Sequence, residues 1–150
     1  MCARSDGVYF LGRDLDWAVA EEGSLKLKEI SYIPSEGYPA GELKHGTLAL
    51  IDIRTTSVVI ITDPALYAKS ENAIEQILSR RGKVAVITNI SEVAKRFEGK
   101  AEIIKIPKCD KFLSPLLSAV IVQLLAYKTS LLLSRDPDKP RNLAKSVTVE

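Results

Sequence analysis

Two cationic residues, Arg141 and Lys145, lie four positions apart near the end of the chain. Small apolar residues surround them, as in a segment that packs on a folded body: Leu143, Ala144, Val147 and Val149. A guanidinium suits phosphate or carboxylate groups, and an amine held away from water can act as a nucleophile. Composition alone favours a solvated terminus, so both a docked and a solvated tail stay open.

Three charged residues early in the chain share one face of a helix. Glu22, Lys26 and Glu29 are four and three positions apart, and residues at these spacings are neighbours on a helix. The spacing favours a solvated ion-pair network, in which each pair contributes about 0.3–0.5 kcal/mol. His45 is the only histidine and lies in a glycine-bearing loop, as surface residues often do. A neutral imidazole can also pass a proton near pH 7.

The composition is that of an ordinary globular domain. The chain has 150 residues, of which 46% are hydrophobic and 27% charged, enough for one hydrophobic core. Its net charge of +2 and its dispersed lysines argue against nucleic-acid binding. Cys2 and Cys109 are far apart, and the N-terminus lacks an apolar leader. We therefore expect a cytoplasmic protein with reduced thiols.

One strongly apolar stretch, residues 116–133, is nearly long enough to span a membrane. It contains Gln123, Lys128 and several hydroxyl groups, and it stands alone in the sequence. These features predict a helix buried in the core of a soluble protein rather than a membrane span.

Short apolar runs alternate with helical patterns along the chain. We expect strands at residues 7–12, 57–62, 83–88 and 101–106. We expect helices from a cap at Asp14 or Asp16 to Tyr32, from Asp63-Pro64 to Gly82, from a cap at Ser91 to Phe97, and from Pro115 onward. Strands that are apolar on both faces predict an α/β fold, a three-layer αβα sandwich with a mainly parallel sheet. The irregular residues 34–52 are where a site is expected.

Three sequence blocks point to a known family. They are residues 25–33 (LKLKEISYI), 36–46 (EGYPAGELKHG) and 138–150 (DKPRNLAKSVTVE). The blocks resemble the isomerase domain of glutamine–fructose-6-phosphate aminotransferases, and their spacing fits the second of that domain's two sugar-isomerase (SIS) repeats. The resemblance implies a flavodoxin-like SIS domain at residues 1–134 and a catalytic C-terminal tail at residues 135–150 that docks on the site.

The resemblance also implies roles for residues of the first two blocks. Glu29 matches the base that moves a proton between carbons 1 and 2 of the sugar, and Lys26 matches a lysine that assists it. His45 matches the histidine that opens the sugar ring and that reaches the active site of the neighbouring subunit in this family. The working unit would then be at least a dimer.

In the tail, Lys145 matches the lysine that forms a Schiff base with the open-chain keto sugar. Ala144 matches a residue whose backbone contacts the sugar, and Arg141 matches the residue that pairs with acidic groups and anchors the tail. The implied ligands are sugar phosphates, with fructose 6-phosphate and ammonia converted to glucosamine 6-phosphate. No cofactor and no metal ion are implied.

The sequence departs from the family pattern at three positions, where Asp14 replaces a glycine, Pro34 a histidine and Thr47 a proline. It also lacks the Ser/Thr/Gly-rich phosphate loop of the first repeat, because residues 54–57 lead into a strand, and it lacks a glutaminase pattern. We therefore expect half of an isomerase domain, inactive or poorly active alone, that self-associates or pairs with a first SIS half. The alternatives are a non-catalytic phosphosugar-binding module and a related sugar-phosphate isomerase or deaminase without glutaminase.

Overall fold

Five strands form one parallel sheet in the computed structural model, which describes residues 1–141. The sheet order is β2-β1-β3-β4-β5, and every neighbouring pair is parallel. The strands are β1 (Gly7–Gly12), β2 (Ser35–Pro39), β3 (Thr55–Ile61), β4 (Lys83–Thr88) and β5 (Glu102–Lys105). All residues of the central strand β3 are buried, which is why it has no polar face in the sequence.

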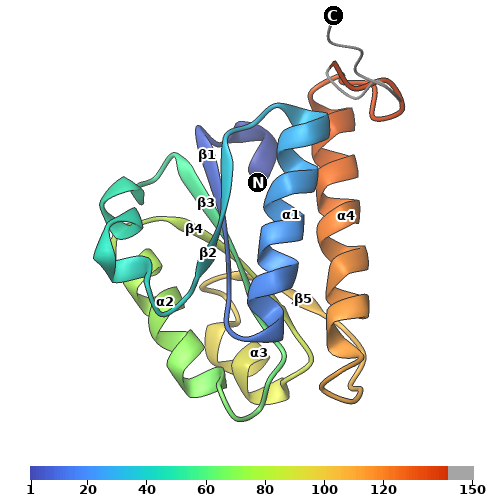
Figure 1. The fold of residues 1–150 in the computed structure, drawn as a ribbon. Helices are drawn as coiled ribbons and strands as arrows, with labels where there is room; N and C mark the ends of the chain where they lie inside the picture. Colours follow the sequence, from blue (N-terminus) through green and yellow to red (C-terminus); the bar gives the residue numbers. More distant parts are fainter. Residues whose placement is uncertain (142–150) are drawn as a thin grey trace, which may run out of the picture.

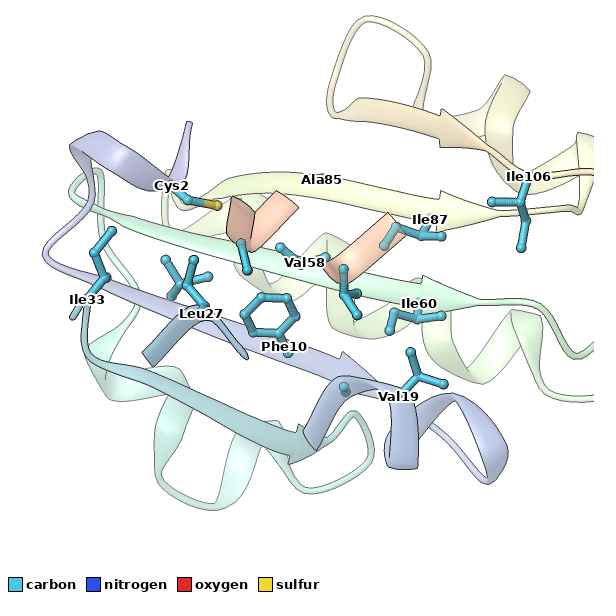
Figure 2. Close-up of a cluster of buried hydrophobic side chains, with 14 residues drawn as sticks. Cys2, Phe10, Val19, Leu27, Ile33, Val58, Ile60, Ala85, Ile87 and Ile106 are labelled. Atoms are coloured by element: carbon cyan, nitrogen blue, oxygen red, sulfur yellow. The ribbon is translucent and has the colours of Figure 1, made fainter. Parts of the chain in front are cut away.

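Helices cover both faces of the sheet (Figure 1). One face carries α1 (Leu15–Ser31) and α4 (Ser114–Leu132), with a core that includes Phe10, Leu27 and Val58 (Figure 2). The other face carries the elements α2 (Tyr67–Ser79), α3 (Ser91–Phe97) and the short 3-10 turns η2 (Leu43–His45) and η3 (Thr47–Leu50). A third 3-10 turn, η1 (Cys2–Arg4), precedes β1. The predicted three-layer αβα sandwich with a parallel sheet is confirmed.

The strand β2 lies inside the stretch that sequence reasoning treated as irregular. Its sequence, Ser-Glu-Gly-Tyr-Pro, contains two residues that disfavour strands, so no strand pattern is visible. An edge position tolerates Pro39, because an edge strand pairs on one side only. Gly37 is required where it is: a Cβ there would lie 2.6 Å from the Cα of Glu21 in α1.

Two predicted helix starts were wrong. The helix expected from Asp63-Pro64 begins at Tyr67, because residues 63–66 form a turn. In that turn the Asp63 carboxylate accepts the Ala65 N–H at 2.9 Å instead of capping a helix. The predicted cap Ser91 is already the first residue of α3, and Ile90 occupies the cap position. Neither aspartate expected at the start of α1 caps it through its side chain.

The helix α4 buries one face only. Ser118, Val122 and Ala126 lie in the interior, as the sequence predicted for a core helix. The outer face is apolar but exposed, and we call it the α4 stripe: Leu116, Val120, Leu124, Tyr127 and Leu131, each 43–65% exposed. In the described part of the chain, α4 alone is long and apolar enough to cross a membrane, with 28% of it buried. Packing of the inner face on α1 is the behaviour of a core helix.

The contact between α1 and α4 depends on a glycine. A Cβ at Gly23 would lie 2.8 Å from ring carbons of Phe10 and 3.0 Å from the Cβ of Val122. Phe10 is fully buried in the sheet and cannot retreat without opening the core. Gly23 therefore sets how closely α1 approaches both β1 and α4.

We predict that Gly23→Val lowers the free energy of unfolding by about 2 kcal/mol, because overpacking a close-packed site forces neighbours to shift. Urea denaturation followed by circular dichroism measures the loss. Gly7→Ala is the matched control, since a Cβ at Gly7 meets its nearest atom at an ordinary 3.7 Å. Equal stabilities for Gly23→Val and the unsubstituted chain would contradict the argument.

Candidate functional site

The residues predicted to carry chemistry on α1 lie in its last turns. The Lys26 ammonium donates a hydrogen bond to Glu29 Oε2 at 2.9 Å and lies 3.8 Å from Glu22 Oε1. The Glu29 side chain is 23% exposed, so it is shielded from water on most sides. The pKa of Lys26 is raised, chiefly by its hydrogen bond to Glu29. The lysine is therefore a cation that orients the carboxylate, and only the carboxylate is free to accept a proton.

The end of the described chain packs on the residue that ends α1. Tyr32 is the C-cap of the helix, and its hydroxyl accepts a hydrogen bond from the Arg141 N–H at 2.9 Å. The Arg141 guanidinium lies 4.1 Å from the centroid of the Tyr32 ring. In Figure 1 this terminal segment lies over the last turn of α1, beyond the end of α4. The segment that leads into the tail is thus next to the turn that carries Glu29.

This contact differs from the predicted anchor of the tail. Arg141 was expected to pair with an acidic group, whereas its contact within residues 1–141 is with an aromatic ring and a hydroxyl. The role of Tyr32 could not be predicted from the sequence, because a tyrosine at the end of a helix is usually a packing residue. The predicted site residues Ala144 and Lys145 lie outside the described residues.

His45 lies on the other side of the sheet from Glu29. His45 belongs to η2, and Leu43 of the same turn is part of the core on the face that α2 covers. The helix α1 packs on the opposite face of the sheet. The His45 side chain is 60% exposed, and its Nε2 lies 4.0 Å from Glu42 Oε2. A single copy of the chain therefore does not bring His45 and Glu29 together.

A surface cavity of about 440 Å³ opens at the amino ends of the strands, near the last turn of α1. Its lining is mostly polar or charged: Asp6, Gly7, Tyr9, Lys28, Pro34, Ser35, Glu36, Leu50, Asp52, Arg54 and Thr55. Burial, with help from the carboxylates of Glu36 and Asp52, raises the pKa of Tyr9. Part of this lining comes from residues 34–52, the stretch in which a site was expected.

The opposite edge of the sheet, at the carboxyl ends of the strands, is occupied by the chain's own charged groups. Folds with this strand order usually bind ligands there, between β1 and β3. The Lys111 ammonium lies 2.9 Å from Asp14 Oδ2 and 2.7 Å from Asp63 Oδ2. A cavity of about 600 Å³ opens beside this cluster, with Lys108 and Lys111 in its lining. Sequence reasoning missed this ion-pair cluster, because its members are far apart in the chain.

Asp14 also has a backbone conformation that favours glycine, with φ of 52°. The aspartate stands where the family resemblance expects a glycine. Its carboxylate lies 2.9 Å from the Lys111 ammonium, an ion pair that a glycine could not make.

Beside this cluster, a buried hydrogen-bond network joins α1, β3 and α4. Asp16 is 4% exposed and accepts hydrogen bonds from the Thr62 N–H at 2.8 Å and the Thr62 hydroxyl at 2.6 Å. The Thr62 hydroxyl also lies 2.8 Å from the hydroxyl of Ser114. Burial raises the pKa of Asp16, and the two Thr62 hydrogen bonds oppose that rise. Among residues 1–141, no cluster of three or more His, Cys, Asp or Glu side chains has the form of a metal site.

Comparison with known proteins extends the resemblance to the whole chain. The model of the SIS domain family matches residues 1–133. The glutamine–fructose-6-phosphate aminotransferase of Methanosarcina mazei is 47% identical over 150 residues, which cover 99% of this chain and 24% of that protein. The corresponding enzyme of Thermus thermophilus is 50% identical over 142 residues, 94% of this chain and 23% of that protein. The chain thus spans about a quarter of the length of these curated relatives.

A solved structure gives the same result. The C-terminal domain of glucosamine-fructose-6-phosphate aminotransferase from Francisella tularensis superposes with a TM-score of 0.83 at 33% identity, covering 89% of this chain and 38% of that chain. Fold and sequence together define a flavodoxin-like α/β domain of the sugar-isomerase type. The chain belongs to the SIS domain family. The resemblance to the isomerase domain of the aminotransferases is confirmed.

The Asp16–Thr62 network makes a testable contribution to stability. We predict that Thr62→Val lowers the free energy of unfolding at pH 7 by about 2 kcal/mol, because a buried carboxylate loses a charged hydrogen bond. Since burial raises the pKa of Asp16, ionising it opposes folding, and this penalty is absent below the unfolded pKa of about 3.9. The penalty is fully present once the pH has risen through the folded pKa. The Thr62 hydroxyl stabilises the ionised carboxylate, so removing it by Thr62→Val costs more at pH 7 than at pH 3.

Urea denaturation at both pH values measures this difference, and Asp16→Asn provides the control. In the Asp16→Asn background, Thr62→Val should cost less at pH 7, because no charge remains to be stabilised. A cost that is the same at both pH values and in both backgrounds would overturn the electrostatic interpretation.

Proposed function

We propose that this chain is the second SIS half of an aminotransferase isomerase domain, which converts fructose 6-phosphate and ammonia to glucosamine 6-phosphate. The observation that carries the proposal is the packing of Arg141 on Tyr32, one helical turn after Glu29. Lys145 is four residues beyond Arg141, and four residues of extended chain span at most about 14 Å. Chain connectivity therefore keeps the amine of Lys145 within reach of the turn that bears Glu29.

The proposed chemistry uses the lysine first. The neutral amine of Lys145 attacks carbon 2 of the open-chain keto sugar, and water leaves to form an imine. Ammonia then adds to the imine carbon and releases the lysine, which leaves the new nitrogen on the sugar. The Glu29 carboxylate next takes a proton from carbon 1 and returns it to carbon 2 through an enediol-type intermediate that carries nitrogen on carbon 2. The carbon-1 hydroxyl gives its proton to that nitrogen, so carbon 1 becomes an aldehyde and carbon 2 carries an amine. The product is an amino aldose that keeps its phosphate.

In the proposed proton transfer, Glu29 is the base and Lys26 orients its carboxylate. The hydrogen bond from the Lys26 ammonium, at 2.9 Å, holds one carboxylate oxygen and leaves the other free for the sugar. Because Lys26 keeps its proton, it serves as a fixed positive charge beside the intermediate, on which negative charge develops. We assign Lys26 this assisting role.

His45 would act on the sugar bound by a neighbouring copy. Ring opening needs a group that passes a proton between the ring oxygen and the anomeric hydroxyl, and a neutral imidazole can do so. The exposed position of His45 on the opposite side of the sheet from Glu29 supports a role in trans. Ala144 and Arg141 complete the proposed site, with Ala144 contacting the sugar and Arg141 holding the tail.

Phosphate binding would come from a first SIS half. This chain lacks the Ser/Thr/Gly-rich phosphate loop expected of the first repeat, because residues 54–57 lead into β3 rather than into a helix. The α4 stripe provides an unpaired apolar face for such a half or for a second copy of this chain. The two cysteines are free thiols, which fits the reducing cytoplasm that we propose as its location.

The catalytic assignment predicts that two substitutions have different effects in the chain complemented with a first SIS half. Lys145→Arg keeps the charge but cannot form an imine, so borohydride in the presence of fructose 6-phosphate should no longer label the chain. Glu29→Gln should still be labelled, because the lysine is intact, while turnover to glucosamine 6-phosphate falls about 100-fold to 10,000-fold.

Lys139→Arg is the control, since it removes a tail lysine to which no role is assigned. Mass spectrometry locates the label, and product formation gives turnover. Unchanged turnover in complemented Lys145→Arg would exclude the Schiff base and leave a tail without a catalytic role as the better hypothesis.

The α4 stripe predicts association. We expect sedimentation equilibrium to show a dimer at concentrations well above micromolar, and Leu124→Glu to weaken it at least about tenfold, because the interface would bury an unpaired charge. Asn72→Glu places the same charge on an exposed position of α2, on the opposite face, and should leave association unchanged. A clean monomer of the unsubstituted chain at these concentrations would rule out self-association through this face.

A further inference from the structure

Tyr32 makes three contacts with the segment that follows α4. Its hydroxyl accepts the Arg141 N–H at 2.9 Å. Its ring lies 4.1 Å from the Arg141 guanidinium and 5.1 Å from that of Arg135. One side chain therefore binds both ends of the short segment between Arg135 and Arg141. Cation–π contacts of this kind, combined with a hydrogen bond, favour one arrangement of that segment.

Tyr32 itself is held firmly at the end of α1. Its backbone N–H donates to the Lys28 carbonyl at 3.1 Å, which closes the last turn of the helix. Its φ of 61° is in the left-handed region, which is rare for an aromatic residue and turns the chain toward β2. An uncommon backbone conformation that the surroundings enforce is often found where a side chain has to be aimed.

The segment that Tyr32 binds has contacts of its own. The Arg135 N–H donates to the Ser130 carbonyl at 2.9 Å, so Arg135 stays attached to the end of α4. The Asp138 N–H donates to Asp136 Oδ1 at 3.0 Å, which forms a tight turn before Pro140. Arg141 comes directly after that turn. Among residues 1–141, the hydrogen bond and cation–π contacts that tie this turn to the end of α1 are all made by Tyr32.

We infer that Tyr32 is the positioning residue that fixes the point from which the C-terminal tail begins. The ring binds the guanidinium of Arg141, the hydroxyl binds its backbone, and both contacts hold Arg141 beside the end of α1. The consequence for catalysis rests on the proposed function, in which Lys145 must meet a sugar held at Glu29. The clamp itself rests only on contacts among residues 1–141.

Limited proteolysis tests the clamp without any assay of catalysis. Trypsin has to take the guanidinium of Arg141 into its own pocket, which the Tyr32 ring prevents, and the Lys139–Pro140 bond resists trypsin. We expect Tyr32→Leu to speed cleavage after Arg141 about tenfold, as expected for the loss of an aromatic–guanidinium contact with its hydrogen bond. Tyr32→Phe keeps the ring and should stay within about twofold of the unsubstituted chain, while hydrogen exchange at the Arg141 amide becomes faster.

Tyr67→Leu is the control, because it removes a tyrosine at the start of α2, on the face of the sheet opposite α1 and α4. Thermal unfolding of all variants shows whether the body stays folded. Faster cleavage in Tyr32→Leu alone supports the clamp. Equal cleavage after Arg141 in Tyr32→Leu and the unsubstituted chain overturns it.

Complementation with a first SIS half then separates the clamp from the proposed chemistry. If the clamp positions Lys145, Tyr32→Leu should lower kcat about tenfold or more with a smaller change in KM, and Tyr32→Phe should restore most of the rate. If cleavage is faster in Tyr32→Leu but borohydride does not label the complemented unsubstituted chain, the clamp is supported and the proposed function is wrong. Unchanged kcat in Tyr32→Leu, with labelling intact, would overturn the positioning role.

Discussion

The close approach of α1 to its neighbours is the constraint on which the rest of the structure depends. Two glycines make it possible: Gly23 lets the helix lie against Phe10 and Val122, and Gly37 lets β2 pass beneath the backbone of Glu21. Because both contacts are with backbone or with buried groups, the helix has little freedom to rotate or slide. The direction of Glu29 and the position of Tyr32 are therefore fixed by packing far from either residue.

The carboxyl ends and the amino ends of the strands carry different kinds of residues. At the carboxyl edge, the Lys111 ammonium bridges the carboxylates of Asp14 and Asp63, and Asp16 accepts a hydrogen bond from the Thr62 hydroxyl. These contacts stabilise the fold at the place where related topologies bind ligands. The candidate chemistry lies instead at the amino edge, where α1 ends and α4 delivers the last part of the chain. Under the proposed function, the phosphate of the sugar would be held by another surface.

Much of the fold could be predicted from the sequence, because four of the strands are apolar runs and the helices between them have clear patterns. The strand β2 could not, since Gly37 and Pro39 have low strand propensity and only the edge position explains them. Glu29 and His45 were found through the resemblance, while their ordinary spacing indicated surface residues. Tyr32 and Lys111 were missed because their roles come from partners more than forty residues away, which no local pattern encodes.

The separation of Glu29 and His45 has a thermodynamic consequence. A site shared between copies exists only in the associated state, so its population follows the association equilibrium as well as folding. Under the proposed function, the tail adds a second condition, because Arg141 would have to be docked before Lys145 could react with the sugar. In the proposed mechanism, the aromatic clamp at Tyr32 meets the second condition, because it holds Arg141 beside the last turn of α1, where Lys26 already holds the carboxylate of Glu29. His45, on the opposite face of the sheet, would have to come from another copy.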